Sequence, residues 1–217
     1  MTYYTEYRLK RAAKFAAVIA AAVTIGVLLG HLVSNYEMRF MLSRKYHGTY
    51  KGIEVYSSGT LDEQNFRSHA EMLGKAPDKL TECCDRMYFT GSDLDLPGND
   101  AGLGAALGLT QNRTVYISTQ SYSSYVVFHE LFHAYDNTHG NPLSSSEEFM
   151  KLYAANRRVI PVFAADSAAY SAEFFAQAGA LYLLMPDELE IAAPDLFKYY
   201  DVTLGFGDRT GQTEDAH

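Results

Sequence analysis

A chain of 217 residues with 47% apolar and 20% charged side chains has the composition of one globular domain plus an appendage. Its 18 basic and 26 acidic residues give a formal net charge of -8, which argues against nucleic acid as a partner because nucleic-acid binders cluster Lys and Arg. Cys83 and Cys84 are the only cysteines and are adjacent, so they predict neither a disulfide framework nor a four-thiolate metal site.

The first distinctive segment is an uncharged apolar run at residues 15–33, FAAVIAAAVTIGVLLGHLV, which follows a basic segment at residues 1–14. Its length matches the hydrocarbon core of a bilayer, at about 1.5 Å per helical residue, and so predicts one transmembrane helix. A cleaved signal peptide would have a shorter apolar region, and a buried core helix would have a polar face. The basic residues before the run lie closer to it than those after it, which favours a single-pass membrane protein with an extracytoplasmic domain.

Residues 34–50 are mixed and polar and suit a juxtamembrane connection, which leaves residues 51–217 as the folded domain. In that domain, β-branched and aromatic runs predict strands, and apolar residues at helical spacing predict helices. The expected strands are 51–57, 86–90 and 114–119, and the expected helices are 61–73, 121–137, 145–158 and 167–185, with a loop at 92–111. Strands come mostly first and helices mostly later, which predicts an α+β domain with a small mixed sheet.

The string His129-Glu130-Leu131-Phe132-His133 carries the strongest chemical signal of the chain. On a helix, residues four apart lie on one face, so His129 and His133 can direct their imidazoles at one metal ion. Glu130 is adjacent, where its carboxylate can hold and deprotonate a water molecule. Zinc suits this pattern because it accepts nitrogen and oxygen ligands and leaves a position open for water. The alternative is a pair of buried histidines satisfied by ordinary hydrogen bonds.

Two histidines do not complete a catalytic metal site, and two residues are candidates for the third ligand. His139 follows His133 by six residues, the spacing of metalloproteases with three histidines, but Asp136 stands where that architecture usually turns at a glycine. Glu173 lies in a later apolar helix, where a buried carboxylate is costly unless it meets a cation. We therefore favour Glu173.

Two strings together carry a resemblance to a known family: HELFHAYD at residues 129–136 and AEFFAQA at residues 172–178. They resemble the anthrax lethal factor-like zinc metallopeptidases, which include secreted Pro-Pro endopeptidases. The resemblance covers about a third of the chain and implies a zincin-like metallopeptidase domain built around an active-site helix. In such a domain, we expect the strand at residues 114–119 to form the edge of the cleft and to pair with an extended peptide substrate.

The resemblance also implies roles for single residues. His129, His133 and Glu173 would be the zinc ligands, and Glu130 the general base. Asp136 would orient one of the ligands, although a residue near a helix end can equally well hydrogen-bond locally.

One position departs from the family pattern. The family places a tyrosine that stabilises the transition state seven residues before the third-ligand glutamate, and here Asp166 occupies that position. An ionised carboxylate cannot donate a hydrogen bond to a developing oxyanion. Tyr170, three residues before Glu173, is our candidate for this role, the alternative being a tyrosine that merely packs.

Together these observations predict a membrane-anchored zinc metalloendopeptidase that acts on a peptide or protein substrate. The alternative, prompted by Asp166, is a catalytically weak or inactive pseudopeptidase that binds peptides or envelope partners. A purely structural zinc fits less well, because two histidines and one glutamate do not make a closed site.

Overall fold

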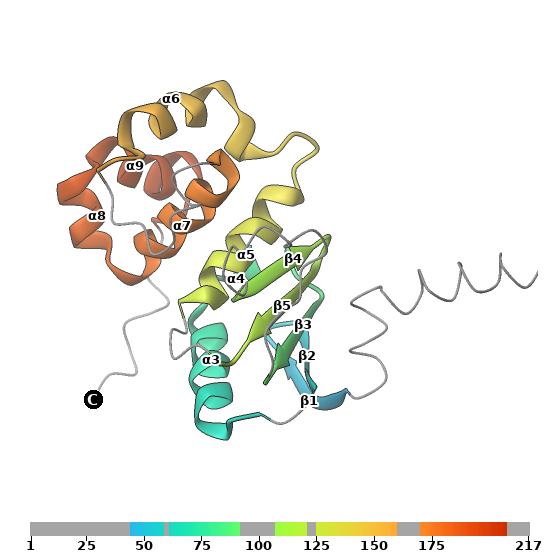
Figure 1. Ribbon diagram of the computed structural model, residues 1–217. Coiled ribbons are helices and arrows are strands. Elements are labelled where there is room, and N and C mark those ends of the chain that lie inside the picture. Colours follow the sequence, from blue (N-terminus) through green and yellow to red (C-terminus); the bar gives the residue numbers. More distant parts are fainter. Residues whose placement is uncertain (1–43, 59–60, 92–106, 121–124, 160–169, 208–217) are drawn as a thin grey trace, which may run out of the picture. The chain divides into compact units, whose positions relative to one another are not determined.

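In the computed structural model, the chain divides into two compact units, Met1–Arg44 and Lys45–His217. The structure describes residues 44–58, 61–91, 107–120, 125–159 and 170–207 (Figure 1). The basic segment and the apolar run, predicted at residues 1–14 and 15–33, lie outside the described residues.

The predicted membrane localisation needs correction. Among the residues that the structure describes, no helix is both long and apolar enough to cross a membrane. The longest of these helices, α7 (Ser171–Leu184), has 14 residues and reaches about 21 Å, whereas the hydrocarbon core is about 30 Å thick. This finding contradicts the prediction of a single-pass membrane protein with an extracytoplasmic domain, and no membrane span is supported.

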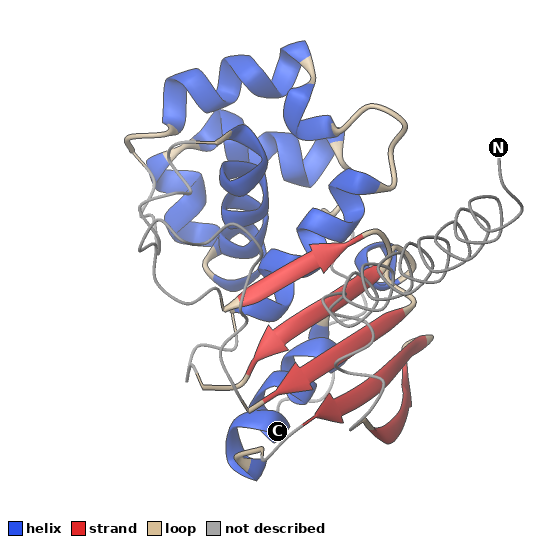
Figure 2. Ribbon diagram, turned by 45° about the vertical axis from the view of Figure 1, so that its right-hand side comes forward, coloured by secondary structure: helices blue, strands red, loops and turns tan. Residues whose placement is uncertain are grey.

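The described strands form one mixed sheet in the order β1-β2-β3-β5-β4 (Figure 2). The central pairs, β2 with β3 and β3 with β5, are parallel, and the outer strands β1 and β4 pair antiparallel with their neighbours. The two outer strands are therefore the edges of the sheet. The bounds of the strands are β1 (Lys45–Tyr50), β2 (Ile53–Ser58), β3 (Arg86–Thr90), β4 (Gly108–Gln111) and β5 (Thr114–Ser118).

Alternation along the strands gives the sheet two different faces. Met87 and Val115 are register partners on β3 and β5, and both are fully buried in the hydrophobic core. One residue further along, Tyr56, Tyr88 and Tyr116 are register partners on the opposite face. Their rings stack with centroids 5.1 and 5.2 Å apart. The apolar face is the one available for helices to cover.

The helices pack against this face and against one another. α5 contacts β4 and β5, and it also contacts α3, α4 and α7, so it lies between the sheet and the later helices (Figure 1). The bounds of the helices are α3 (Glu63–Lys75), α4 (Asp78–Thr81), α5 (Val126–Asn137), α6 (Glu147–Asn156), α7 (Ser171–Leu184), α8 (Pro186–Ala192) and α9 (Pro194–Lys198), with the short turns η1 (Leu143–Ser145) and η3 (Tyr199–Thr203).

Local side-chain chemistry decides where several helices begin. Asp62 accepts a hydrogen bond from the main-chain N–H of the third residue of α3, and Ser146 does the same for α6. Ser146 is therefore the N-cap residue of α6. Pro186 is the first residue of α8, where its missing N–H costs nothing.

Most of the predicted elements agree with the structure. The strand at residues 86–90 is confirmed, and the other expected strands and the helices expected at 61–73 and 145–158 are confirmed within two residues at each end. α5 and α7 confirm the remaining two helices over the described residues. The α+β architecture with a mixed sheet fits the expected class of a zincin-like domain.

Three features differ from the prediction. Lys45–Tyr50, within the predicted connection, forms β1, so the folded unit starts earlier than residue 51. Gly108–Gln111, within the predicted loop, forms β4, which is too short and too poor in β-branched residues to give a strand signal. β5 is not the edge strand, because β3 and β4 occupy both of its sides. The edge next to α5 is β4.

Candidate metal centre and active site

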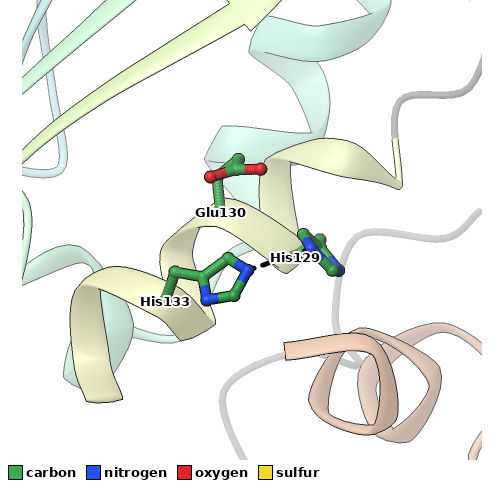
Figure 3. A group of neighbouring side chains, drawn as sticks. All are labelled: His129, Glu130 and His133. Atoms are coloured by element: carbon green, nitrogen blue, oxygen red, sulfur yellow. Dashed lines mark hydrogen bonds between the residues drawn. The ribbon is translucent and has the colours of Figure 1, made fainter. Parts of the chain in front are cut away.

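The two histidines of α5 meet at their ring nitrogens. His129 and His133 are one helical turn apart, and their Nε2 atoms are 3.1 Å from each other (Figure 3). The rings are roughly perpendicular, with centroids 4.7 Å apart. The α-helical period puts both side chains on one face, as the sequence predicted, and the surrounding apolar residues bury His129.

α7 brings Glu173 to the same point. One carboxylate oxygen, Oε2, lies 3.3 Å from His129 Nε2, and the other, Oε1, lies 3.3 Å from His133 Nε2. Glu173 belongs to the first turn of α7, where the free N–H groups of the helix favour a negative charge. The close packing of α5 and α7 thus joins residues that are far apart in the sequence.

The spacing of these atoms can be compared with that of ligands around one metal ion. Tetrahedral zinc, with bonds of about 2.0–2.1 Å, holds neighbouring ligand atoms roughly 3.3 Å apart. The three separations in this cluster are 3.1, 3.3 and 3.3 Å. Two imidazole nitrogens and one carboxylate also match the donor set of an open, catalytic zinc site. His129, His133 and Glu173 therefore fit a zinc ion.

The electrostatics of the cluster favour a bound cation. Hydrogen bonds with His129 and then His133 lower the pKa of Glu173 far below its ordinary value, and the opposing effect of burial is smaller. Burial lowers the pKa of His133, but the bond to Glu173 and the charges of Glu130, Glu173 and Asp136 together raise it above its ordinary value. The carboxylate is therefore ionised at neutral pH, and it attracts positive charge.

Glu130 is directed away from the two imidazoles and toward the sheet (Figure 3). Its side chain is buried, and one of its carboxylate oxygens lies within 4.8 Å of a ring nitrogen of each of His129 and His133. The hydroxyl of Thr110 on β4 lies 2.7 Å from Glu130 Oε2 and 2.9 Å from the main-chain oxygen of the same residue. The Glu130 carboxylate thus lies close to the two imidazoles and is held at one oxygen by β4.

Two other predicted residues lie outside this cluster. His139 lies just beyond the end of α5, and its Nδ1 is 2.8 Å from the main-chain oxygen of Tyr135 in that helix. Asp136 is buried and accepts hydrogen bonds from the N–H and the hydroxyl of Ser144, at 2.9 and 2.6 Å. These local bonds tie the end of α5 to η1, which agrees with the local interpretation of Asp136.

The structure describes Tyr170, the candidate for oxyanion stabilisation, but not Asp166. Tyr170 is the N-cap residue of α7, and 65% of its surface is exposed. Asp166 lies outside the described residues.

Tyr125 at the start of α5 is a neighbour of the site that the sequence did not single out. Its ring lies edge-on to that of His129, with centroids 5.8 Å apart, and its hydroxyl donates to Gln177 Oε1 at 3.1 Å. Burial, followed by the charges of Glu130 and Glu173, raises the pKa of Tyr125 to about 12. In the sequence, only its position four residues before His129, on the same helix face, indicated that Tyr125 lies near the site.

Comparisons with known proteins support the fold. No family model matches the chain, and neither does any curated protein. Among solved structures, the chain is similar to the Pro-Pro endopeptidase PPEP-2 from Paenibacillus alvei, with a TM-score of 0.55 and 20% sequence identity. The match covers 68% of this chain and 95% of that chain. At this level of identity the likeness shows a shared fold alone.

Proposed function

We propose that this protein is a zinc-dependent endopeptidase, with His129, His133 and Glu173 as zinc ligands and Glu130 as general base. The observation that carries the proposal is the meeting of the Glu173 carboxylate with both imidazoles, at 3.3 Å from each. Likeness in fold to a Pro-Pro endopeptidase supports the same class of reaction.

The proposed reaction is hydrolysis of a peptide bond. When bound, zinc supplies a Lewis acid that polarises the scissile carbonyl and makes water more acidic. Glu130 takes a proton from the attacking water, whose oxygen forms the new bond to the carbonyl carbon, and then gives that proton to the leaving amine as the C–N bond breaks. Tyr170 is proposed to donate a hydrogen bond to the oxyanion, because its phenol is exposed and it precedes Glu173 by only three residues.

The proposed substrate strand lies along β4. An edge strand has N–H and C=O groups that can pair with an extended peptide, and β4 is the edge strand beside α5. This position replaces the expected pairing with β5. A peptide bound there lies next to Glu130, since Thr110 of β4 contacts the Glu130 carboxylate.

Metal analysis combined with cleavage of a peptide library tests the proposal. The library includes Pro-Pro bonds, and the products are identified by mass spectrometry. We expect the wild-type protein and a Glu130→Gln variant to bind one zinc each, and the variant to cleave about 10²–10⁴ times more slowly. A Tyr170→Phe variant should keep the zinc and lose about 10²–10³ in kcat if this phenol donates to the oxyanion.

Other outcomes would separate the alternatives. Zinc binding without any cleavage that depends on Glu130 would support the peptide-binding pseudopeptidase that Asp166 suggested. A folded protein that binds no zinc would contradict the metallopeptidase altogether.

A further inference from the structure

Two residues of β4 face the general-base candidate. Gly108 and Thr110 are register partners of Ile117 and Val115, whose side chains belong to the hydrophobic core. Because side chains two apart on a strand share a face, both positions lie on the side of the sheet that α5 covers. Leu109 and Gln111 belong to the opposite face, so β4 presents a glycine and a hydroxyl to α5.

The Thr110 hydroxyl contacts Glu130 at two points. It lies 2.9 Å from the main-chain oxygen and 2.7 Å from Oε2 at the tip of the side chain. A hydroxyl both donates and accepts. It can therefore donate to the ionised carboxylate, and it can accept from the carboxyl group and donate to the main-chain oxygen after Glu130 has taken a proton. The contact is preserved through a proton transfer.

Gly108 makes this arrangement possible, because there is no room for a side chain at its position. A Cβ atom there would lie 2.5 Å from Glu130 Cγ and 2.6 Å from Glu130 Cδ, far inside van der Waals contact. The flexible end of the glutamate would move more easily than the sheet. A side chain at position 108 would thus displace the carboxylate while leaving the fold in place.

We propose that β4 positions the Glu130 carboxylate for proton transfer. Thr110 is the positioning residue, and the absence of a side chain at Gly108 leaves room for the carboxylate. The inference rests on the proposed function and deepens it. A glutamate side chain with several free torsions loses rate when it occupies unproductive rotamers, because reaction needs a near-attack geometry. β4, the strand proposed to bind the substrate, would therefore also hold the Glu130 carboxylate. This one strand would set the distance between the substrate and the base.

Substitutions of Thr110 in the full-length, zinc-loaded protein test this inference. Valine keeps the shape and removes the hydroxyl, whereas serine keeps the hydroxyl. We expect Thr110→Val to lower kcat about 10–100-fold, the usual effect of losing a supporting hydrogen bond, with KM within about twofold and the zinc content unchanged. Thr110→Ser should remain within about threefold of the wild-type kcat.

The control is Thr49→Val on β1, the opposite edge strand, where the exposed hydroxyl bonds only to Tyr46 among the contacts of the described residues. It should leave kcat and KM unchanged. Gly108→Ala is a second variant that retains the hydroxyl of Thr110 and should also lower kcat, which covers the case in which Thr110→Val does not fold. A wild-type kcat in Thr110→Val, or equal losses in the valine and serine variants, would overturn the inference.

Crystal structures of the wild-type and Thr110→Val proteins give a readout that does not need activity. We expect the Glu130 carboxylate to leave its position beside β4 in the variant, and an unmoved carboxylate would overturn the inference. If the wild-type protein cleaves no peptide, the proposed function fails, and the crystal structures still decide whether Thr110 holds the Glu130 side chain.

Discussion

The two sides of α5 hold their polar residues in different ways. Toward α7, His129 and His133 meet the ionised carboxylate of Glu173, a charged contact that a cation can replace. Toward β4, Glu130 meets the neutral hydroxyl of Thr110. The difference indicates that the meeting of the two histidines with Glu173 depends on the packing of α5 against α7, and that the orientation of the Glu130 carboxylate depends on the packing of α5 against β4.

Substitutions on the side of α5 that faces α7 should therefore have the largest effect on the proposed zinc binding. Glu173→Ala removes one of three proposed ligands, so we expect the Kd for zinc to rise by more than about 100-fold, beyond the 10–100-fold typical for the loss of a supporting residue. Competition with a chelator measures this change. His139→Ala is the matched control and should retain zinc, because His139 bonds to the main-chain oxygen of Tyr135 near the end of α5. Release of zinc by the His139 change alone would make the assignment of Glu173 wrong.

A smaller effect is expected from widening the gap between α5 and α7. A Cβ added at Gly179 of α7 would lie 2.6 Å from three ring atoms of Phe132 on α5. Phe132 is fully buried and packs against Phe175 and Tyr200, so the ring has little room to move. We expect Gly179→Ala to reduce the free energy of unfolding by about 1–3 kcal/mol and to weaken zinc binding.

The control for this variant is the same substitution in α3. A Cβ at Gly74 meets nothing within 4 Å, so Gly74→Ala should raise the free energy of unfolding by up to about 1 kcal/mol. Thermal unfolding monitored by circular dichroism measures both variants. Equal stability of the two would show that α5 and α7 can separate at no cost.

The smallest effect concerns the pH dependence of stability in the zinc-free protein, prepared with a chelator. The pKa of His133 is raised above 6.5, so its contribution is fully present below pH 6.5 and is lost as the pH rises through the raised value. The pKa of Glu173 is lowered from 4.5, so its contribution is present above pH 4.5 and is lost as the pH falls. The Tm contribution of this pair should therefore be largest between pH 4.5 and 6.5.

Scanning fluorimetry from acidic to alkaline pH checks this expectation, with a shift of at most a few degrees because Glu173 is partly exposed. Glu173→Gln should flatten the dependence on both sides of the maximum. An unchanged pH profile in that variant would show that other groups are responsible, and that the α7 side is no more charge-dependent than the β4 side.

The sequence was most informative where a single helix carries the pattern. The spacing of His129 and His133 already puts both imidazoles on one face, because the α-helix repeats every 3.6 residues. Glu173 stood out because a carboxylate in an apolar helix is costly without a cation nearby. Prediction failed at β4, whose four residues, Gly108–Gln111, have no recognisable period and start with a glycine.

What the sequence determined by itself is the set of groups available for chemistry and their placement along individual helices, since both follow from local periodicity and the cost of burying charge. Only the tertiary structure decided that β4, not β5, forms the edge of the sheet, because strand order depends on pairing between distant segments. Only the packing of α5 against α7 and β4 brought Glu173 to the two histidines and Thr110 to Glu130. These contacts join segments 20 or more residues apart, and no local pattern records which of them will meet.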